Sequence, residues 1–121
     1  MNINNIFNQE NLAAIVEICE AIETVAEETA HTHHIPKMWH EGDVSMHRIG
    51  SELCRLARKG KAKRCNVSIS PKAQCILTWM IELTGHDTGH HSDHTYREIA
   101  SKMSSVMTVL HETLKAMQQN I

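Results

Sequence analysis

Apolar residues recur at intervals of three and four in four segments of the chain, which is the period of an amphipathic helix. In the first segment, glutamates lie largely on the face opposite the apolar one. Asn8 is suited to cap the start of this helix, and Pro36 is suited to stop it. The apolar positions of this helix are Leu12, Ile15, Val16, Cys19, Ile22 and Ala26.

Two shorter helices are predicted in the middle of the chain. The second segment, residues 43–59, is apolar on one face and is followed by Gly60, a residue type that often ends helices. The third segment begins with Ser70 as its cap and Pro71 at the first helical position, and Gly85 follows its end. Both ends of the third helix are therefore marked in the sequence.

The fourth segment starts with Thr95-x-x-Glu98, the pattern of a capping box, and its apolar positions continue to Met117. The last 50 or so residues also resemble a winged-helix or helix-turn-helix unit, which implies DNA binding. In that resemblance the first helix holds Tyr96, Ile99 and Ala100, the turn Ser104 and Ser105, and the recognition face Thr108, His111, Glu112 and Lys115. One continuous helix is favoured, because the apolar stripe is unbroken and the proposed reading face is not basic.

Amphipathic helices with short connections usually become antiparallel neighbours. We therefore expect an all-α fold, a four-helix up-down bundle-like single domain over residues 1–121 with long first and last helices. Helices of about 38 and 35 Å would overhang partners of about 26 and 21 Å, at 1.5 Å per residue. Apolar residues near the long ends would then be uncovered in a monomer, which favours a homodimer. These residues are Val25, Ala26, Leu114 and Met117.

Location and chemistry are constrained by what the sequence lacks. No apolar run approaches the roughly 20 residues that span a bilayer, and the start "MNINNIFNQE" does not have the pattern of a secretory signal. The four cysteines form no C-x-x-C pair, so reduced thiols are expected. No glycine-rich phosphate loop, G-x-S-x-G or H-E-x-x-H motif occurs. We expect a cytoplasmic, non-enzymatic protein without a membrane partner.

Charge is unevenly distributed along the chain. Residues 48–72 carry eight bases and one acid, whereas residues 1–47 carry eight acids and one base. Six of the bases fall in "RLARKGKAKR": Arg55, Arg58, Lys59, Lys61, Lys63 and Arg64. Such a cluster suits phosphate or an acidic protein surface, although a solvated basic turn beside a helix end is the alternative. We predict a binding surface for a protein or a nucleic acid, in a regulator or an inhibitor.

The stretch "GHDTGHHSDHT", residues 85–95, contains four of the ten histidines. In an up-down bundle it meets the histidines that follow the first helix, at the end opposite the basic cluster. Imidazole nitrogen binds zinc and other divalent metals, so a metal-binding protein is an alternative in which a bound metal would be the only cofactor. Its candidate ligands are His31, His34, His86, His90 and His94. A proton-sensitive cluster or an ordinary polar loop also fits the pattern.

Overall fold

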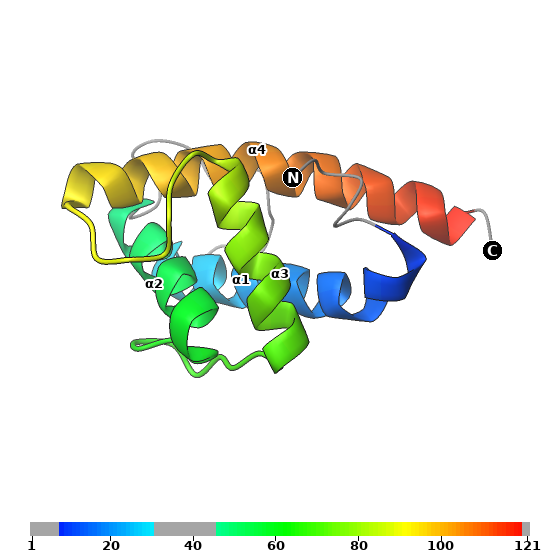
Figure 1. Ribbon diagram of the computed structural model, residues 1–121, viewed down its shortest axis with the longest axis horizontal. Helices are drawn as coiled ribbons and strands as arrows, with labels where there is room; N and C mark the ends of the chain where they lie inside the picture. Colours follow the sequence, from blue (N-terminus) through cyan, green and yellow to red (C-terminus); the bar gives the residue numbers. More distant parts are fainter. Residues whose placement is uncertain (1–7, 31–45, 120–121) are drawn as a thin grey trace.

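The computed structural model describes residues 8–30 and 46–119, which form four α-helices preceded by a short 3-10 helix (Figure 1). The all-α class is confirmed, and the first and last α-helices are the longest. The elements are η2 (Gln9–Asn11), α1 (Leu12–Ala30), α2 (Met46–Lys59), α3 (Pro71–Leu83) and α4 (Asp93–Gln119).

<br>

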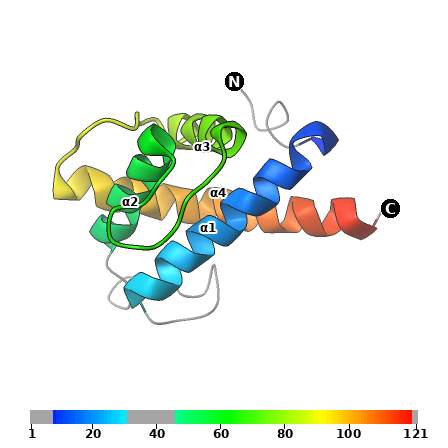
Figure 2. The same cartoon turned by 90° about the horizontal axis from the view of Figure 1, so that it is seen from below.

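The helices cross one another, and the up-down alignment is not confirmed. Both α2 and α3 run across α4 in Figure 1, and the second view shows α1 lying obliquely beneath α4 (Figure 2). α2 contacts α1, α3 and α4, and its interface with α4 is the most extensive in the described part of the chain. α2 is thus the central helix of this arrangement.

The backbones of α2 and α4 meet at Gly50. A β-carbon placed on Gly50 would lie 2.1 Å from the carbonyl oxygen of Tyr96, so no side chain fits between the two helices. Ile49 and Leu53 of α2 and Ile99 of α4 are fully buried around this contact. The close crossing therefore requires glycine in the interior of α2, although glycine has a low helix propensity.

The ends of α3 agree with the sequence. The Ser70 hydroxyl accepts a hydrogen bond from the backbone N–H of Ala73 at 3.2 Å, and Pro71 is the first helical residue. Gly85 has a φ of 88°, a left-handed conformation that favours glycine. These signals are local, so they operate whatever α3 packs against.

The predicted cap of the first helical segment, Asn8, is confirmed. The Asn8 side chain accepts a hydrogen bond from the backbone N–H of Asn11 at 3.1 Å, so it caps η2, which leads directly into α1. Pro36, the expected stop, lies outside the described residues, as does the expected start of α2 at residue 43.

The prediction for the start of α4 is wrong. α4 begins at Asp93, and the hydroxyl of Ser92 accepts from the backbone N–H of Thr95 at 3.4 Å. Ser92 therefore takes the capping position three residues before Thr95, and Glu98 is left to pair with other side chains. The continuity of α4 through Ser104 and Ser105 also shows that the helix-turn-helix interpretation is wrong.

The core joins residues of all four α-helices. Val25 and Ala26 are 0% exposed and Leu114 is 8% exposed, while Met117 is half-buried. Because the helices cross, the difference in helix length does not leave these positions uncovered. The argument for a homodimer from overhanging helix ends is therefore wrong.

Among the described helices, none has both the length and the apolar character needed to cross a bilayer.

Gly50→Ala is expected to destabilise the protein. Glycine-to-alanine changes inside helices usually stabilise by about 0.5–1 kcal/mol, but here the added methyl group collides with the α4 backbone. We expect a loss of about 2 kcal/mol or more, measured by urea unfolding. Ser101→Ala, at an exposed position of α4, is the control and should stay within about 0.5 kcal/mol. A stabilised Gly50→Ala variant would contradict the close crossing.

Cys75 is expected to be the only rapidly reacting thiol. It is exposed, whereas Cys19, Cys54 and Cys65 are buried. Burial raises the pKa of Cys19 to about 12 and that of Cys54 to about 11, so few thiolates form there at pH 8. A thiol reagent should modify one cysteine in the native protein and all four after unfolding. Cys75→Ser should abolish the fast reaction; a second fast thiol would contradict this.

Candidate functional site

The polar residues of α2 form one stripe along the helix. This face holds residues at spacings of three and four along the helix: Arg48, then the neighbours Ser51 and Glu52, then Arg55 and Arg58. The apolar residues of α2 face the core instead. This stripe lines a pocket of about 180 Å³.

The other walls of the pocket come from separate parts of the chain. Lys63 and Arg64 belong to the hairpin between α2 and α3, and His47 lies in the first turn of α2. His90 and Tyr96 come from the segment before α4 and from the first turns of α4. The site therefore combines residues that are more than 40 positions apart in sequence.

The hairpin reverses the chain directly after α2. Gly60 has a φ of 73°, which favours glycine, and its N–H donates to the carbonyl oxygen of Leu56 at 2.8 Å. The N–H of Ile69 donates to the Gly60 carbonyl at 2.8 Å, and that of Ala62 to Val67 at 2.9 Å. These backbone bonds close a short hairpin, which returns residues 61–64 toward the polar stripe of α2.

Glu52 anchors this hairpin to α2. Its side chain is 3% exposed, and its Oε2 atom accepts from the backbone N–H groups of Lys63 at 2.9 Å and Arg64 at 3.3 Å. Hydrogen bonds from two N–H groups compensate the cost of burying the carboxylate. Because the backbone makes both bonds, the side chains of Lys63 and Arg64 remain exposed at the pocket.

Three arginines of the pocket carry buried nitrogen atoms without a hydrogen-bond partner in the described residues. These atoms are Nε of Arg48, Nε of Arg55, and Nε and Nη1 of Arg58. A buried donor without an acceptor costs about 1–3 kcal/mol, and more when it is charged. Among the residues that line the pocket, five are cationic and one, Glu52, is a carboxylate. The site is therefore suited to an oxyanion, which arginine binds through paired N–H groups.

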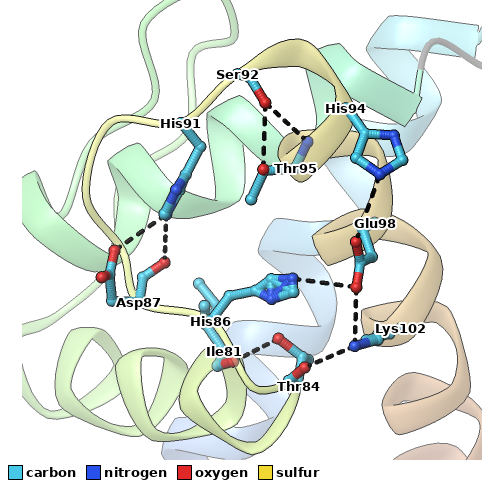
Figure 3. A network of polar contacts seen from close by, with 10 residues as sticks. All are labelled: Ile81, Thr84, His86, Asp87, His91, Ser92, His94, Thr95, Glu98 and Lys102. Carbon is cyan, nitrogen blue, oxygen red and sulfur yellow. Dashed lines mark hydrogen bonds and ion pairs between the residues drawn. The ribbon is translucent and has the colours of Figure 1, made fainter.

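The histidine loop, residues 85–92, is fixed to α4 (Figure 3), and its residue His90 lines the pocket. The Nε2 atom of His91 lies 2.9 Å from the carbonyl oxygen and 3.0 Å from the Oδ1 atom of Asp87. The backbone N–H of His91 donates to the Tyr96 hydroxyl at 3.2 Å. The rings of His47 and His91 pack edge-on against Tyr96, with centroid distances of 5.8 and 5.6 Å. Tyr96 thereby connects the loop to α2.

A second set of polar contacts gathers at Glu98 (Figure 3). Its Oε1 atom lies 3.0 Å from Lys102 Nζ and 3.3 Å from His86 Nε2, and its Oε2 atom lies 3.8 Å from His94 Nε2. Lys102 also donates to the carbonyl oxygen of Thr84 at 3.1 Å, which ties the end of α3 to α4. The hydrogen bond from Lys102, supported by its positive charge, lowers the pKa of Glu98.

The candidate metal ligands do not assemble in the described part of the chain. His86 and His94 contact Glu98, whereas His90 lines the arginine pocket. His31 and His34 lie outside the described residues. Within residues 8–30 and 46–119, no three His, Cys, Asp or Glu side chains are placed to hold a metal ion together. The metal site remains a prediction.

The expected separation of histidines and basic residues is wrong. His47 and His90 line the same pocket as Arg55 and Arg58. The cause is the crossing of the helices: the segment after α3 passes α2 before α4 begins (Figure 1). One face of the molecule therefore holds both features that the sequence singled out.

The six predicted basic residues divide into two groups. Arg55 and Arg58 are half-buried in the pocket wall, whereas Lys59, Lys61, Lys63 and Arg64 are exposed. The prediction did not include Arg48, although it stands two helical turns before Arg55 on the same stripe. It also did not include Tyr96, which no spacing in the sequence connects to α2.

Comparisons with models of protein families, with curated proteins and with solved structures find no match to this chain.

Glu98→Gln is expected to lower the melting temperature at pH 7, because the amide does not attract Lys102 as the carboxylate does. The pKa of Glu98 lies below its ordinary value of 4.5 in the folded protein. Its stabilising contribution is thus complete above the unfolded pKa and is lost as the pH falls through the folded pKa. The difference from wild type should close on acidification, whereas Glu112→Gln, at an exposed position of α4, should match wild type throughout. A difference that persists at pH 3 would contradict this origin.

Proposed function

We propose that this protein binds an acidic protein partner and acts as a non-enzymatic regulator or inhibitor. Its binding surface, called the basic surface below, consists of the hairpin cations and the arginines of the pocket: Arg55, Arg58, Lys59, Lys61, Lys63 and Arg64. The observation that carries the proposal is the set of buried guanidinium nitrogens that have no acceptor among the described residues, beside four exposed cations. A partner with acidic groups supplies acceptors for the guanidinium groups and ammonium groups of this surface.

A role for these cations in ending α2 does not account for them. The carbonyl oxygen of Arg58 accepts from Gln74 Nε2 at 3.0 Å, and that of Leu56 accepts from Gly60 N at 2.8 Å. Backbone and amide donors therefore already satisfy these carbonyl groups near the end of the helix. Two cations in the last turn, Arg58 and Lys59, suit the helix dipole. The remaining positive charge of the hairpin is available for an interaction with another molecule.

A protein partner fits the distribution of charge better than a nucleic acid. The exposed cations of the basic surface lie at the end of α2 and in the hairpin that follows it, and do not form a row along one helix that could follow a groove. The exposed positions of α4 carry both signs of charge, including Arg97, Lys115 and Glu112. A compact patch of this kind suits an acidic patch on another protein, where complementary charge raises the association rate and the specificity.

The paired charge reversal Lys61→Glu/Arg64→Glu tests this proposal. Both side chains are exposed, so the melting temperature should change little, since surface substitutions usually cost within about 0.5 kcal/mol each. Affinity capture from nuclease-treated lysate of the source cells should recover a partner with the wild type. The affinity of the purified pair should fall about tenfold or more in the variant, because like charges then face each other.

The matched control is Arg97→Glu/Lys115→Glu, which makes the same change in net charge on α4. It should bind the partner as the wild type does. Equal binding by Lys61→Glu/Arg64→Glu contradicts the proposal, and loss of the captured material on nuclease treatment identifies a nucleic acid as the partner instead.

A further inference from the structure

We infer that the pocket between the polar stripe of α2, the hairpin and the histidine loop is a binding site for a phosphate monoester group. The inference rests on the proposed function, since it names the chemical group that the basic surface recognises. Inorganic phosphate offers the same terminal oxygens as a monoester carried on a partner, so the same pocket chemistry applies to both.

The size of the pocket restricts its ligand to one small group. Its volume of about 180 Å³ is below the roughly 300–1,000 Å³ of sites that enclose drug-sized molecules. A phosphate diester carries a substituent on each side of its phosphorus, so its chain cannot enter a pocket of this size end-on. A monoester has a single substituent and can enter with its three terminal oxygens first.

The charge of the pocket also favours a monoester. Its cations stand on two sides, with Arg48, Arg55 and Arg58 on α2 and Lys63 and Arg64 on the hairpin. A carboxylate offers one negative charge and two oxygens in a plane, whereas a phosphate monoester carries about −1.5 to −2 at pH 7 and has three acceptor oxygens. A tetrahedral group can accept from both walls at once.

The unpaired donors of the pocket match the acceptors of this ligand. Nε of Arg48, Arg55 and Arg58, with Nη1 of Arg58, are buried atoms without partners in the described residues. Tyr96 also lines the pocket, and its hydroxyl, which accepts from His91 N, can donate one hydrogen bond as well. Charge-assisted hydrogen bonds from arginine to phosphate are among the strongest that proteins make. The guanidinium groups that carry these atoms line the pocket, so a phosphate bound there lies beside three arginines at once.

Glu52 does not oppose this assignment, although its carboxylate borders the pocket. Its Oε2 atom is engaged by the backbone N–H groups of Lys63 and Arg64. The same bonds hold the hairpin wall in place. The carboxylate therefore has structural partners in the hairpin backbone, whereas the arginine nitrogens have none among the described residues.

Titration with inorganic phosphate, followed by amide chemical shifts at constant ionic strength, tests the inference. The amides of Ser51, Arg55 and His90 should shift and saturate in the wild type. Arg55→Gln/Arg58→Gln should weaken phosphate binding about tenfold or more, because two charged donors are lost. Arg97→Gln, the same change at an exposed position outside the pocket, should stay within about twofold of wild type. Acetate should bind about tenfold more weakly than phosphate.

Arg55→Lys/Arg58→Lys keeps the charge and removes the planar donors, so it remains informative if the glutamine variant unfolds. It should still bind phosphate several-fold more weakly than wild type. The inference is overturned if shifts do not saturate, if acetate equals phosphate, or if Arg97→Gln weakens binding as much as the pocket variants. If the lysine variant binds as wild type does, the unpaired guanidinium atoms do not form the site.

A serine-phosphorylated peptide and its unphosphorylated form distinguish the source of the group. Tighter binding of the phosphorylated peptide than of inorganic phosphate assigns the pocket to a phosphate carried on a partner, whereas binding of inorganic phosphate alone assigns it to the free ion. Partner binding that depends on Lys61 and Arg64 without any phosphate binding overturns this inference and leaves the proposed function standing.

Discussion

The contact between Gly50 of α2 and the backbone of Tyr96 in α4 determines how the rest of the molecule is arranged. With no side chain at position 50, α2 can lie directly across α4. The crossing places the Tyr96 ring between His47 and His91, so the histidine loop is fixed beside α2. Tyr96, whose backbone touches Gly50, lines the pocket together with the polar stripe of α2. A wider crossing would move His90 away from the arginines.

The sequence predicted the parts of the fold that depend on neighbouring residues. The cap at Ser70 and the left-handed residue Gly85 each act within one turn of the helix, so their effect does not depend on the tertiary structure. The prediction of Thr95 as the cap is wrong because Ser92 offers an equivalent hydroxyl three residues earlier. Periodicity shows which face of a helix is buried, but it does not show the angle at which a neighbour crosses. For that reason, the periodicity of the sequence does not determine whether the helices align up and down.

The candidate site was predictable only in the residues that are close in sequence. Arg55 and Arg58 were found from local charge, and Arg48 could have been found from the helical period of the same stripe. His90 and Tyr96 reach the pocket through the crossing of α2 and α4, which no local pattern encodes. The prediction of the histidines as metal ligands depends on the up-down bundle, which would bring their segments to one end of the molecule. In the structure His90 belongs with the arginines instead.

Because Glu52 holds the hairpin by its main chain, the path of the hairpin does not depend on the side chains that would contact a ligand. Glu52 binds the main chain at positions 63 and 64, and the identity of the side chains there does not enter those hydrogen bonds. Lys63 and Arg64 can therefore be exchanged for other residues while the loop keeps its path. Such a loop is a suitable target for directed evolution, in which substitutions of its side chains change the ligand preference and leave the fold intact. Variation at these two positions should be tolerated far more readily than variation at Glu52 itself.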